Sequence, residues 1–169
     1  LGLRLGLRPG EAWALHWGDI KNGAVNVTRG IQRTGGLAKI SDDLKTEASK
    51  RTITLPLDMS AWVEEHRSTQ EHERKAAIKA STGWVDARLV FTGPTGDLVN
   101  PELSRSRLVD ICRRAGIDPI RPNELRHSCA SLLADEGVPN ELIADLLGHT
   151  TTRMVDQTYR HRVRPFTNV

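Results

Sequence analysis

Residues 122–149 read PNELRHSCASLLADEGVPNELIADLLGH, and their apolar residues recur at helical spacing. The first stripe follows the i, i+4, i+7, i+8 pattern of one helix face and consists of Leu125, Cys129, Leu132 and Leu133. Gly137-Val138-Pro139 interrupts it, and a second stripe, closed by Gly148, consists of Leu142, Ile143, Leu146 and Leu147. The pattern predicts two consecutive helices, the first with Pro122 in its first turn.

Outside this pair the sequence shows both strand and helix patterns. Val25/Val27 and Ile53/Leu55 have the period of two that is typical of half-buried strands. Strands are predicted over 25–29, 37–44, 51–55 and 89–92. Helices are predicted over 57–80, 101–115 and 151–160, and the apolar side of the second consists of Leu103, Leu108 and Ile111. Two short helices come first, one ending near Arg8 and the next beginning with Pro9.

The length of 169 residues fits one domain. With 38% hydrophobic and 27% charged residues, the composition excludes a disordered tail, a collagen-like rod and a membrane bundle. No stretch approaches the ~20 apolar residues of a membrane-spanning helix, and Arg4 and Arg8 interrupt the first apolar run, which excludes a signal peptide. Because the chain starts within a helical pattern and without Met, we expect it to be a fragment of a longer protein.

The cysteines and the basic residues indicate where the protein is located and what kind of ligand suits it. Cys112 and Cys129 indicate neither a disulfide framework nor a zinc site, so a cytoplasmic location is expected. The net charge is +3, and no lysine occurs after position 99, so the fixed positive charges there are all on arginine, whose planar guanidinium suits phosphate. A modest positive charge does not by itself identify a nucleic-acid binder.

Conventional catalytic motifs are missing from the sequence. It has no P-loop, no HExxH and no serine in a G-x-S-x-G turn, and His66 and His72 face different sides of their predicted helix. What remains is a set of residues in short motifs: Arg8 in GLRPGE (6–11), Lys45 in a predicted hairpin turn, Arg126 in NELRH (123–127), His149 in LLGH (146–149) and Tyr159 in TYR (158–160). Tyr159 is the only tyrosine of the chain.

These motifs, in this order, resemble the catalytic domain of the tyrosine recombinases, the phage-integrase family. The similarity runs from about Gly6 to Pro165, and LRHSCASLL (125–133) and LLGH (146–149) look most like that family. The resemblance implies an α+β fold, mostly helical, with a small three-stranded antiparallel sheet packed on the helical core and Lys45 in a turn of that sheet. It also implies that residues 1–169 are a single catalytic domain, truncated at its N-terminus, because full-length relatives carry a DNA-clamping domain upstream.

The implied activity is site-specific cutting and rejoining of duplex DNA through a 3′-phosphotyrosine, with no metal, nucleotide or other cofactor. In this scheme Tyr159 is the nucleophile, Arg8 and Arg126 stabilise the negative charge of the transition state, and Lys45 protonates the leaving oxygen. His149 donates to the phosphate or assists proton movement. The implied partners are duplex DNA and further copies of the chain on DNA, as a synaptic tetramer in the full-length protein, and no membrane.

Neighbouring basic residues compete for two of these roles. Arg4, one helical turn earlier, is the alternative to Arg8, and Lys39 and Lys50 are the alternatives to Lys45. The Pro-Gly-Glu after Arg8 and the KTEASKRTITLP context (45–56) favour Arg8 and Lys45.

Other residues have simpler structural interpretations. Arg126 could pair with Glu124 or Asp156 instead of with a phosphate. Glu11 could hold a catalytic residue in position without contacting the substrate, or it could be a solvated carboxylate. His127 points about 100° away from Arg126 on the helix, so we expect it to be a core histidine.

The sequence departs from the family pattern at two positions. The family usually has histidine three residues before the second arginine, where this chain has Asn123. Asn123 shares a helix face with Arg126 and can donate a hydrogen bond to a phosphate oxygen, but it cannot shuttle a proton. Alternatively Asn123 only caps the helix, although Pro122 at the first helical position argues against a cap. The spacing from His149 to Tyr159 is ten residues, one more than the commonest family pattern.

Two other functions remain open. A truncated chain, or one with Asn123 in place of histidine, could be a catalytically impaired DNA-binding remnant of an integrase. Residues 122–148 could also form a helix-turn-helix regulator, although that interpretation leaves Arg8, Lys45 and Tyr159 unexplained.

Overall fold

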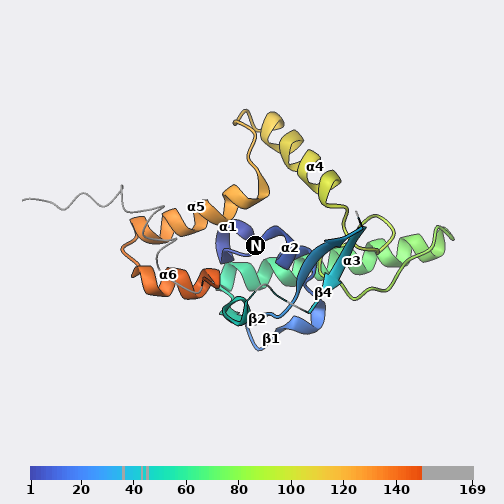
Figure 1. The fold of residues 1–169 in the computed structure, drawn as a ribbon. Helices are drawn as coiled ribbons and strands as arrows, with labels where there is room; N and C mark the ends of the chain where they lie inside the picture. Colours follow the sequence, from blue (N-terminus) through green and yellow to red (C-terminus); the bar gives the residue numbers. More distant parts are fainter. Residues whose placement is uncertain (36, 43, 45, 150–169) are drawn as a thin grey trace, which may run out of the picture.

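The computed structural model describes residues 1–35, 37–42, 44 and 46–149 (Figure 1). Its helices are α1 (Gly2–Leu5), α2 (Pro9–Trp13), α3 (Leu57–Lys79), α4 (Pro101–Arg114), α5 (Pro122–Asp135) and α6 (Asn140–Leu147). Its strands are β1 (Ile20–Lys21), β2 (Ala24–Val27), β3 (Gly30–Thr34), β4 (Leu37–Ser41) and β5 (Arg51–Thr54). The mostly helical α+β class is confirmed, while the helix predicted over 151–160 lies outside the described residues.

The strands form two separate sheets. A three-stranded antiparallel sheet has the order β1-β2-β5, and β3 and β4 form a hairpin of their own. The three-stranded sheet is therefore present, but its third member is the short β1, and the strand predicted over 37–44 does not belong to it. The chain turns back at Gly35, in the left-handed region at φ 60°, so the strand over 37–41 pairs with the preceding β3. The predicted strand over 89–92 contains only isolated bridges, His16 to Leu89 and Thr92 to Leu98.

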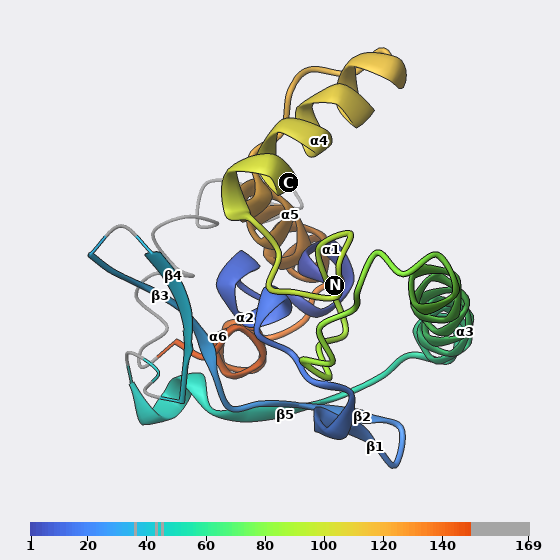
Figure 2. The same cartoon turned by 90° about the vertical axis from the view of Figure 1, so that its right-hand side faces the viewer.

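The β3–β4 hairpin is seated on α2 and extends to the side opposite α3 (Figure 2). Gly10 of α2 lies so close to the hairpin that a Cβ there would be 3.4 Å from the backbone nitrogen of Ile31. Arg33 forms an ion pair with Glu102 at the start of α4. The hairpin is thus held between α2 and α4, and the chain that follows it leads to the Leu44 region.

The main core lies between the β1-β2-β5 sheet, the first two helices and α3. Its buried members are Leu5, Leu7, Leu15, Val25, Val27, Ile53, Leu55, Met59 and Val90. A second cluster joins α5 to α6 and consists of Ala130, Ile143, Ala144 and Leu147. Burial of these side chains supplies the main driving force for packing the α5–α6 pair.

Gly6 marks the point where α1, α5 and α6 meet. It ends α1 in the left-handed region, at φ 62°, and a Cβ there would lie 2.5 Å from Cδ2 of Leu147. The same residue's carbonyl accepts a hydrogen bond from Arg126 of α5. Only glycine allows this close approach of the α1 end to α6.

Helix α4 projects away from the rest of the molecule in both views (Figures 1 and 2). Its start is fixed by Asn100, whose side chain accepts from the backbone N–H groups of Glu102 and Leu103. Leu103 and Ile111 are 45% and 53% exposed, so the predicted apolar side of this helix does not face a core. No helix of the described residues is both long and apolar enough to cross a membrane.

The close contact at Gly6 predicts a large loss of stability for Gly6→Ala. A left-handed alanine costs about 1–2 kcal/mol, and forcing the methyl group against Leu147 adds about 1–3 kcal/mol. Gly23→Ala is the matched control, because Gly23 has φ 68° and nothing within 4 Å of its added Cβ. Urea unfolding should show the larger decrease in the free energy of unfolding for Gly6→Ala, and equal decreases would contradict the packing argument.

Candidate functional site

Arg8 is positioned by the turn between α1 and α2. It is the N-cap of α2 in an extended conformation, and Pro9 begins the helix as predicted. The Glu11 carboxylate accepts from the Arg8 backbone N–H at 2.8 Å and from its guanidinium at 2.7 Å. The Arg8 side chain stays 39% exposed, so its remaining N–H groups can reach a ligand. Arg4, the alternative to Arg8, instead pairs with Asp58 on an exposed surface.

Glu11 is buried, with 4% of its surface exposed, so the interpretation as a solvated carboxylate is wrong. Burial acts to raise the pKa of Glu11, but the hydrogen bonds and charge of Arg51, together with the bonds from Arg8, outweigh it and lower that pKa. Glu11 is therefore an ionised carboxylate held between two arginines.

Arg126 is buried, with 6% exposure, in the second turn of α5. It donates to the carbonyl of Gly6 at 2.5 Å and to the carbonyl of Leu147 at 2.5 Å. Burial and the positive charges of Arg8 and Arg51 lower the pKa of Arg126 to about 10, which leaves it charged at neutral pH. Glu124, one of its possible partners, instead accepts from the Arg121 backbone at 2.6 Å, and the other, Asp156, lies outside the described residues.

His149 follows the left-handed Gly148 that ends α6. Its Nε2 lies 3.0 Å from Nη2 of Arg126, and since a guanidinium can only donate, Nε2 is the acceptor and the neutral ring carries its proton on Nδ1. Burial, and then the charges of Arg126 and Arg8, lower the pKa of His149 to about 4. The buried Nδ1 has no hydrogen-bond partner among the described residues. His149 is thus a neutral imidazole with one unused donor.

Arg51 is part of the same cluster, although the sequence analysis missed it. Its Nε donates to the carbonyl of Leu146 at 2.6 Å, and its Nη2 donates to Glu11 at 3.0 Å. Strand alternation in the sequence could have identified Arg51. It stands two residues before the buried Ile53 and therefore lies on the same inward face of the strand. The last carbonyls of α6, those of Leu146, Leu147 and Gly148, accept from Arg51, Arg126 and Arg8.

Asn123 lies at the mouth of a cleft that also contains Arg8. It is the second residue of α5, after Pro122, and the N-cap is Arg121. The capping interpretation of Asn123 is therefore wrong. The side chain is exposed, which leaves its amide accessible from the cleft.

The cleft runs between α2, the β3–β4 hairpin and the starts of α4 and α5. Its volume is about 590 Å³, and its lining includes Arg8, Glu11, Ile31, Leu44 and Asn123. An adjoining groove of about 700 Å³ shares Trp13, Arg33 and Asn123 with it and adds Arg105 and Arg121. We call the two together the channel; its lining has four arginines, Arg8, Arg33, Arg105 and Arg121, against three glutamates, Glu11, Glu102 and Glu124.

The structure thus brings together four of the six predicted site residues. Arg126 and His149 are in direct contact, and Arg8 lies beside them at the end of α6. Asn123 lines the same cleft as Arg8. Lys45 and Tyr159 lie outside the described residues. His127 is exposed, so the prediction of a core histidine is wrong. The buried face of α5, at Arg126, Cys129 and Ala130, is centred about 100° away from His127, so His127 lies on the flank of the helix, where it lines the groove.

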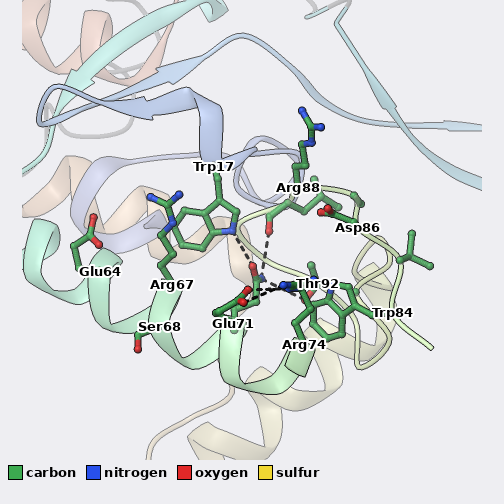
Figure 3. A pocket seen from close by; sticks show the side chains of 15 residues that line it. Trp17, Glu64, Arg67, Ser68, Glu71, Arg74, Trp84, Asp86, Arg88 and Thr92 are labelled. Carbon is green, nitrogen blue, oxygen red and sulfur yellow. Dashed lines mark hydrogen bonds and ion pairs between the residues drawn. The ribbon is translucent and has the colours of Figure 1, made fainter. Parts of the chain in front are cut away.

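Figure 3 shows a different cavity, between α3 and the segment over 84–96. Arg67 lies over the ring of Trp17, at 5.4 Å from its centroid, and Arg74 pairs with Glu71 at 2.8 Å. Acidic and basic side chains balance along its lining, and none of the described candidate residues reaches it. This cavity therefore lacks the excess of positive charge that a phosphate site needs.

A mostly helical α+β domain with arginines gathered on a cleft is a scaffold suited to a phosphate-bearing substrate. Residues 1–164 match the family model described as the phage integrase family. The chain belongs to the phage integrase family.

Individual relatives agree with this assignment. An integrase of Streptomyces ambofaciens is 34% identical over 144 residues, covering 83% of this chain and 34% of that protein. A tyrosine recombinase XerC-like protein of Caldanaerobacter subterraneus subsp. tengcongensis is 28% identical over 171 residues, covering 95% of this chain and 44% of that protein. The chain thus spans less than half the length of these two relatives.

Solved structures share the fold. The Tn1549 transposon integrase in complex with transposon right end DNA superposes with a TM-score of 0.75 at 18% identity, covering 96% of this chain and 53% of that one. The XerA recombinase superposes with a TM-score of 0.68 at 17% identity, covering 96% and 54%.

The lowered pKa of His149 predicts a specific acid sensitivity. The unfolded chain protonates this residue below its ordinary pKa of 6.5, the folded protein only below about 4, so folding stability falls as pH decreases through that window. The slope reaches at most about 1.4 kcal/mol per pH unit. His149→Gln should flatten the profile of the free energy of unfolding between pH 6.5 and 4, measured by urea unfolding. His72→Gln, on the exposed side of α3, is the matched control for removing an imidazole, and an unchanged slope in His149→Gln would contradict the lowered pKa of His149.

Proposed function

We propose that this chain is the catalytic domain of a site-specific DNA recombinase or integrase, which cuts and rejoins duplex DNA through a 3′-phosphotyrosine. The observation that carries the proposal is the contact of Arg126 with a neutral His149, beside the partly exposed Arg8, which lines the cleft. Domain boundaries of 1–169 and a cytoplasmic location belong to the same proposal.

The proposed reaction needs a nucleophile, a charge-stabilising pair and a proton donor. The Tyr159 hydroxyl attacks phosphorus, the new O–P bond replaces the bond to the 5′-oxygen, and the 5′-hydroxyl leaves. The phosphotyrosine link keeps the bond energy in the protein, so rejoining by the reverse attack requires no nucleotide. Lys45 is proposed to supply the proton to the leaving 5′-oxygen.

Arg8 and Arg126 are proposed to hold the non-bridging phosphate oxygens, where negative charge collects in the transition state. A guanidinium has five N–H donors, and three of those of Arg126 are used by Gly6, Leu147 and His149. The remaining donors, with the exposed part of Arg8, supply fixed cationic hydrogen bonds without a metal ion. His149, in contact with Arg126, is proposed to donate to the phosphate or to assist proton movement.

The proposed partner is duplex DNA, laid along the channel and the projecting α4. Exposed arginines of α4 are Arg105, Arg107, Arg113 and Arg114, and the channel adds Arg33 and Arg121. Phosphate contacts by such residues make binding strongly salt-dependent. Self-association on DNA, as a synaptic tetramer, is proposed for the full-length protein.

The alternative within the same family is a DNA-binding remnant that no longer cleaves. A separate helix-turn-helix regulator is disfavoured, because Ile143 and Leu147 of α6 are buried and the end of that helix is bound by three arginines. The remnant and the enzyme differ in one observable, a covalent protein–DNA adduct.

A nicked suicide duplex, which traps the covalent adduct, tests the enzyme. Tyr159→Phe should abolish the adduct on denaturing gels, because it removes the attacking oxygen. Arg8→Ala and Arg126→Ala should each slow adduct formation by about 10²-fold or more, the scale for loss of one transition-state donor. EDTA should not change the rate. No adduct from the native chain would favour the remnant, and an adduct with Tyr159→Phe would refute the nucleophile.

The cleft position of Asn123 predicts a smaller effect. Its amide supplies one hydrogen bond, worth about 1 kcal/mol to a neutral group and somewhat more to a charged phosphate, so Asn123→Ala should slow cleavage by about tenfold. Asn123→His should be tolerated and should gain rate at mildly acidic pH, where imidazolium is populated. The pH–rate profiles of the three proteins measure this. A normal cleavage rate for Asn123→Ala would show that the Asn123 amide makes no hydrogen bond that contributes to cleavage.

A further inference from the structure

Arg51 is not one of the site residues predicted from the sequence, yet its side chain makes four hydrogen bonds. Its side chain is 7% exposed and begins β5. It donates from Nε to Leu146 at 2.6 Å, from Nη1 to the Ser49 carbonyl at 3.0 Å, and from Nη1 and Nη2 to Glu11 at 3.3 and 3.0 Å. One buried side chain thus joins the sheet, α2 and the end of α6.

The contact with Glu11 has a direct electrostatic consequence for Arg8. Glu11 carries one negative charge and contacts two guanidiniums, Arg51 through both oxygens and Arg8 through Oε1 at 2.7 Å. Without Arg51, the whole carboxylate charge would be compensated by Arg8, which would then attract a phosphate less. With Arg51 present, the trio retains one net positive charge on the side that faces the cleft.

The contact with Leu146 has a geometric consequence for His149. The neighbouring carbonyls of Leu147 and Gly148 accept from Arg126 and Arg8, and His149 is the next residue. A Cβ on Gly148 would lie 3.1 Å from Nη1 of Arg51, so the arginine packs directly against this turn. Fixing Leu146 therefore fixes the start of the segment that carries His149.

We propose that Arg51 is a positioning residue for DNA cleavage: it holds the Glu11 carboxylate so that Arg8 keeps its charge toward the scissile phosphate, and it anchors the α6 end that presents His149. The proposal rests on the proposed function, and it assigns Arg51 no contact with the DNA.

Arginine is required for this role because its donors diverge. The Nε–H points to the sheet-facing carbonyl of α6 while the two Nη groups reach Glu11 and Ser49. Lysine has three donors on a single atom and cannot span these acceptors. Arg51→Lys therefore keeps the positive charge but loses the divergent hydrogen-bond donors, whereas Arg51→Met loses the charge and the donors.

The test is single-turnover cleavage of the suicide duplex, with a phosphodiester or a methylphosphonate at the scissile position. A first-order rate constant does not depend on the fraction of protein that folds, so reduced stability of a variant does not obscure it. Arg51→Met and Arg51→Lys should slow phosphodiester cleavage by about 10–100-fold, the usual cost of losing an outer supporting partner. Lys21→Met, on the exposed edge of the same sheet, is the charge-matched control and should cleave at the native rate.

Two readouts separate positioning from a merely structural role. The methylphosphonate lacks one anionic oxygen, so both Arg8→Ala and the Arg51 variants should lose less rate on it than on the phosphodiester. The losses in the double variant Arg8→Ala/Arg51→Met should be clearly less than multiplicative, because the part of the Arg51 effect that passes through Glu11 is already lost in Arg8→Ala, while the part that passes through the α6 end remains.

Equal losses on both substrates, or multiplicative losses in the double variant, would overturn the role of Arg51. If the native chain does not cleave the methylphosphonate, the double variant decides alone. An inactive native chain on the phosphodiester would instead refute the proposed function, so the two failures are distinguishable.

Discussion

Three guanidinium groups converge on the last carbonyls of α6, and the rest of the site depends on this convergence. The C-terminal end of a helix carries unsatisfied carbonyls and a partial negative charge. Here Arg51 from the sheet, Arg126 from α5 and Arg8 from the α1–α2 turn satisfy them. Residues that are far apart in the chain are thereby held in fixed positions around one helix end.

This arrangement buries more positive than negative charge. Glu11 is the buried carboxylate that compensates the arginines, and backbone carbonyls provide the remaining acceptors. Burying uncompensated charge is costly, and the lowered pKa values of Arg126 and His149 express that cost. An anionic ligand at this cluster would supply negative charge, so its binding is expected to stabilise the folded protein.

The surroundings of the site divide into a rigid base and an open side. The base is the pair of cores, with Gly6 allowing α1 to approach α6 closely. The open side is the cleft between the β3–β4 hairpin and the starts of α4 and α5. An exposed ion pair of Arg33 with Glu102 lies between the hairpin and α4, and exposed pairs of this kind contribute little to stability.

Local patterns were sufficient for the main helices. The stripes in 122–149 and Pro9 and Pro122 at helix starts are readable from neighbouring residues, because capping and helix periodicity act over a few positions. The motifs around Arg8, Arg126 and His149 were singled out by their resemblance to a known family, and periodicity alone does not assign them a role. Strand pairing, the outward His127 and the buried Glu11 were decided only by the tertiary structure. Which strand pairs with the one over 37–41, and whether a charged side chain is covered, depend on segments distant in the sequence. Arg51 illustrates both cases. Its place on the inward face follows from strand alternation in the sequence. Its contacts with Glu11 and Leu146 form only because the tertiary structure brings α2 and α6 to this strand.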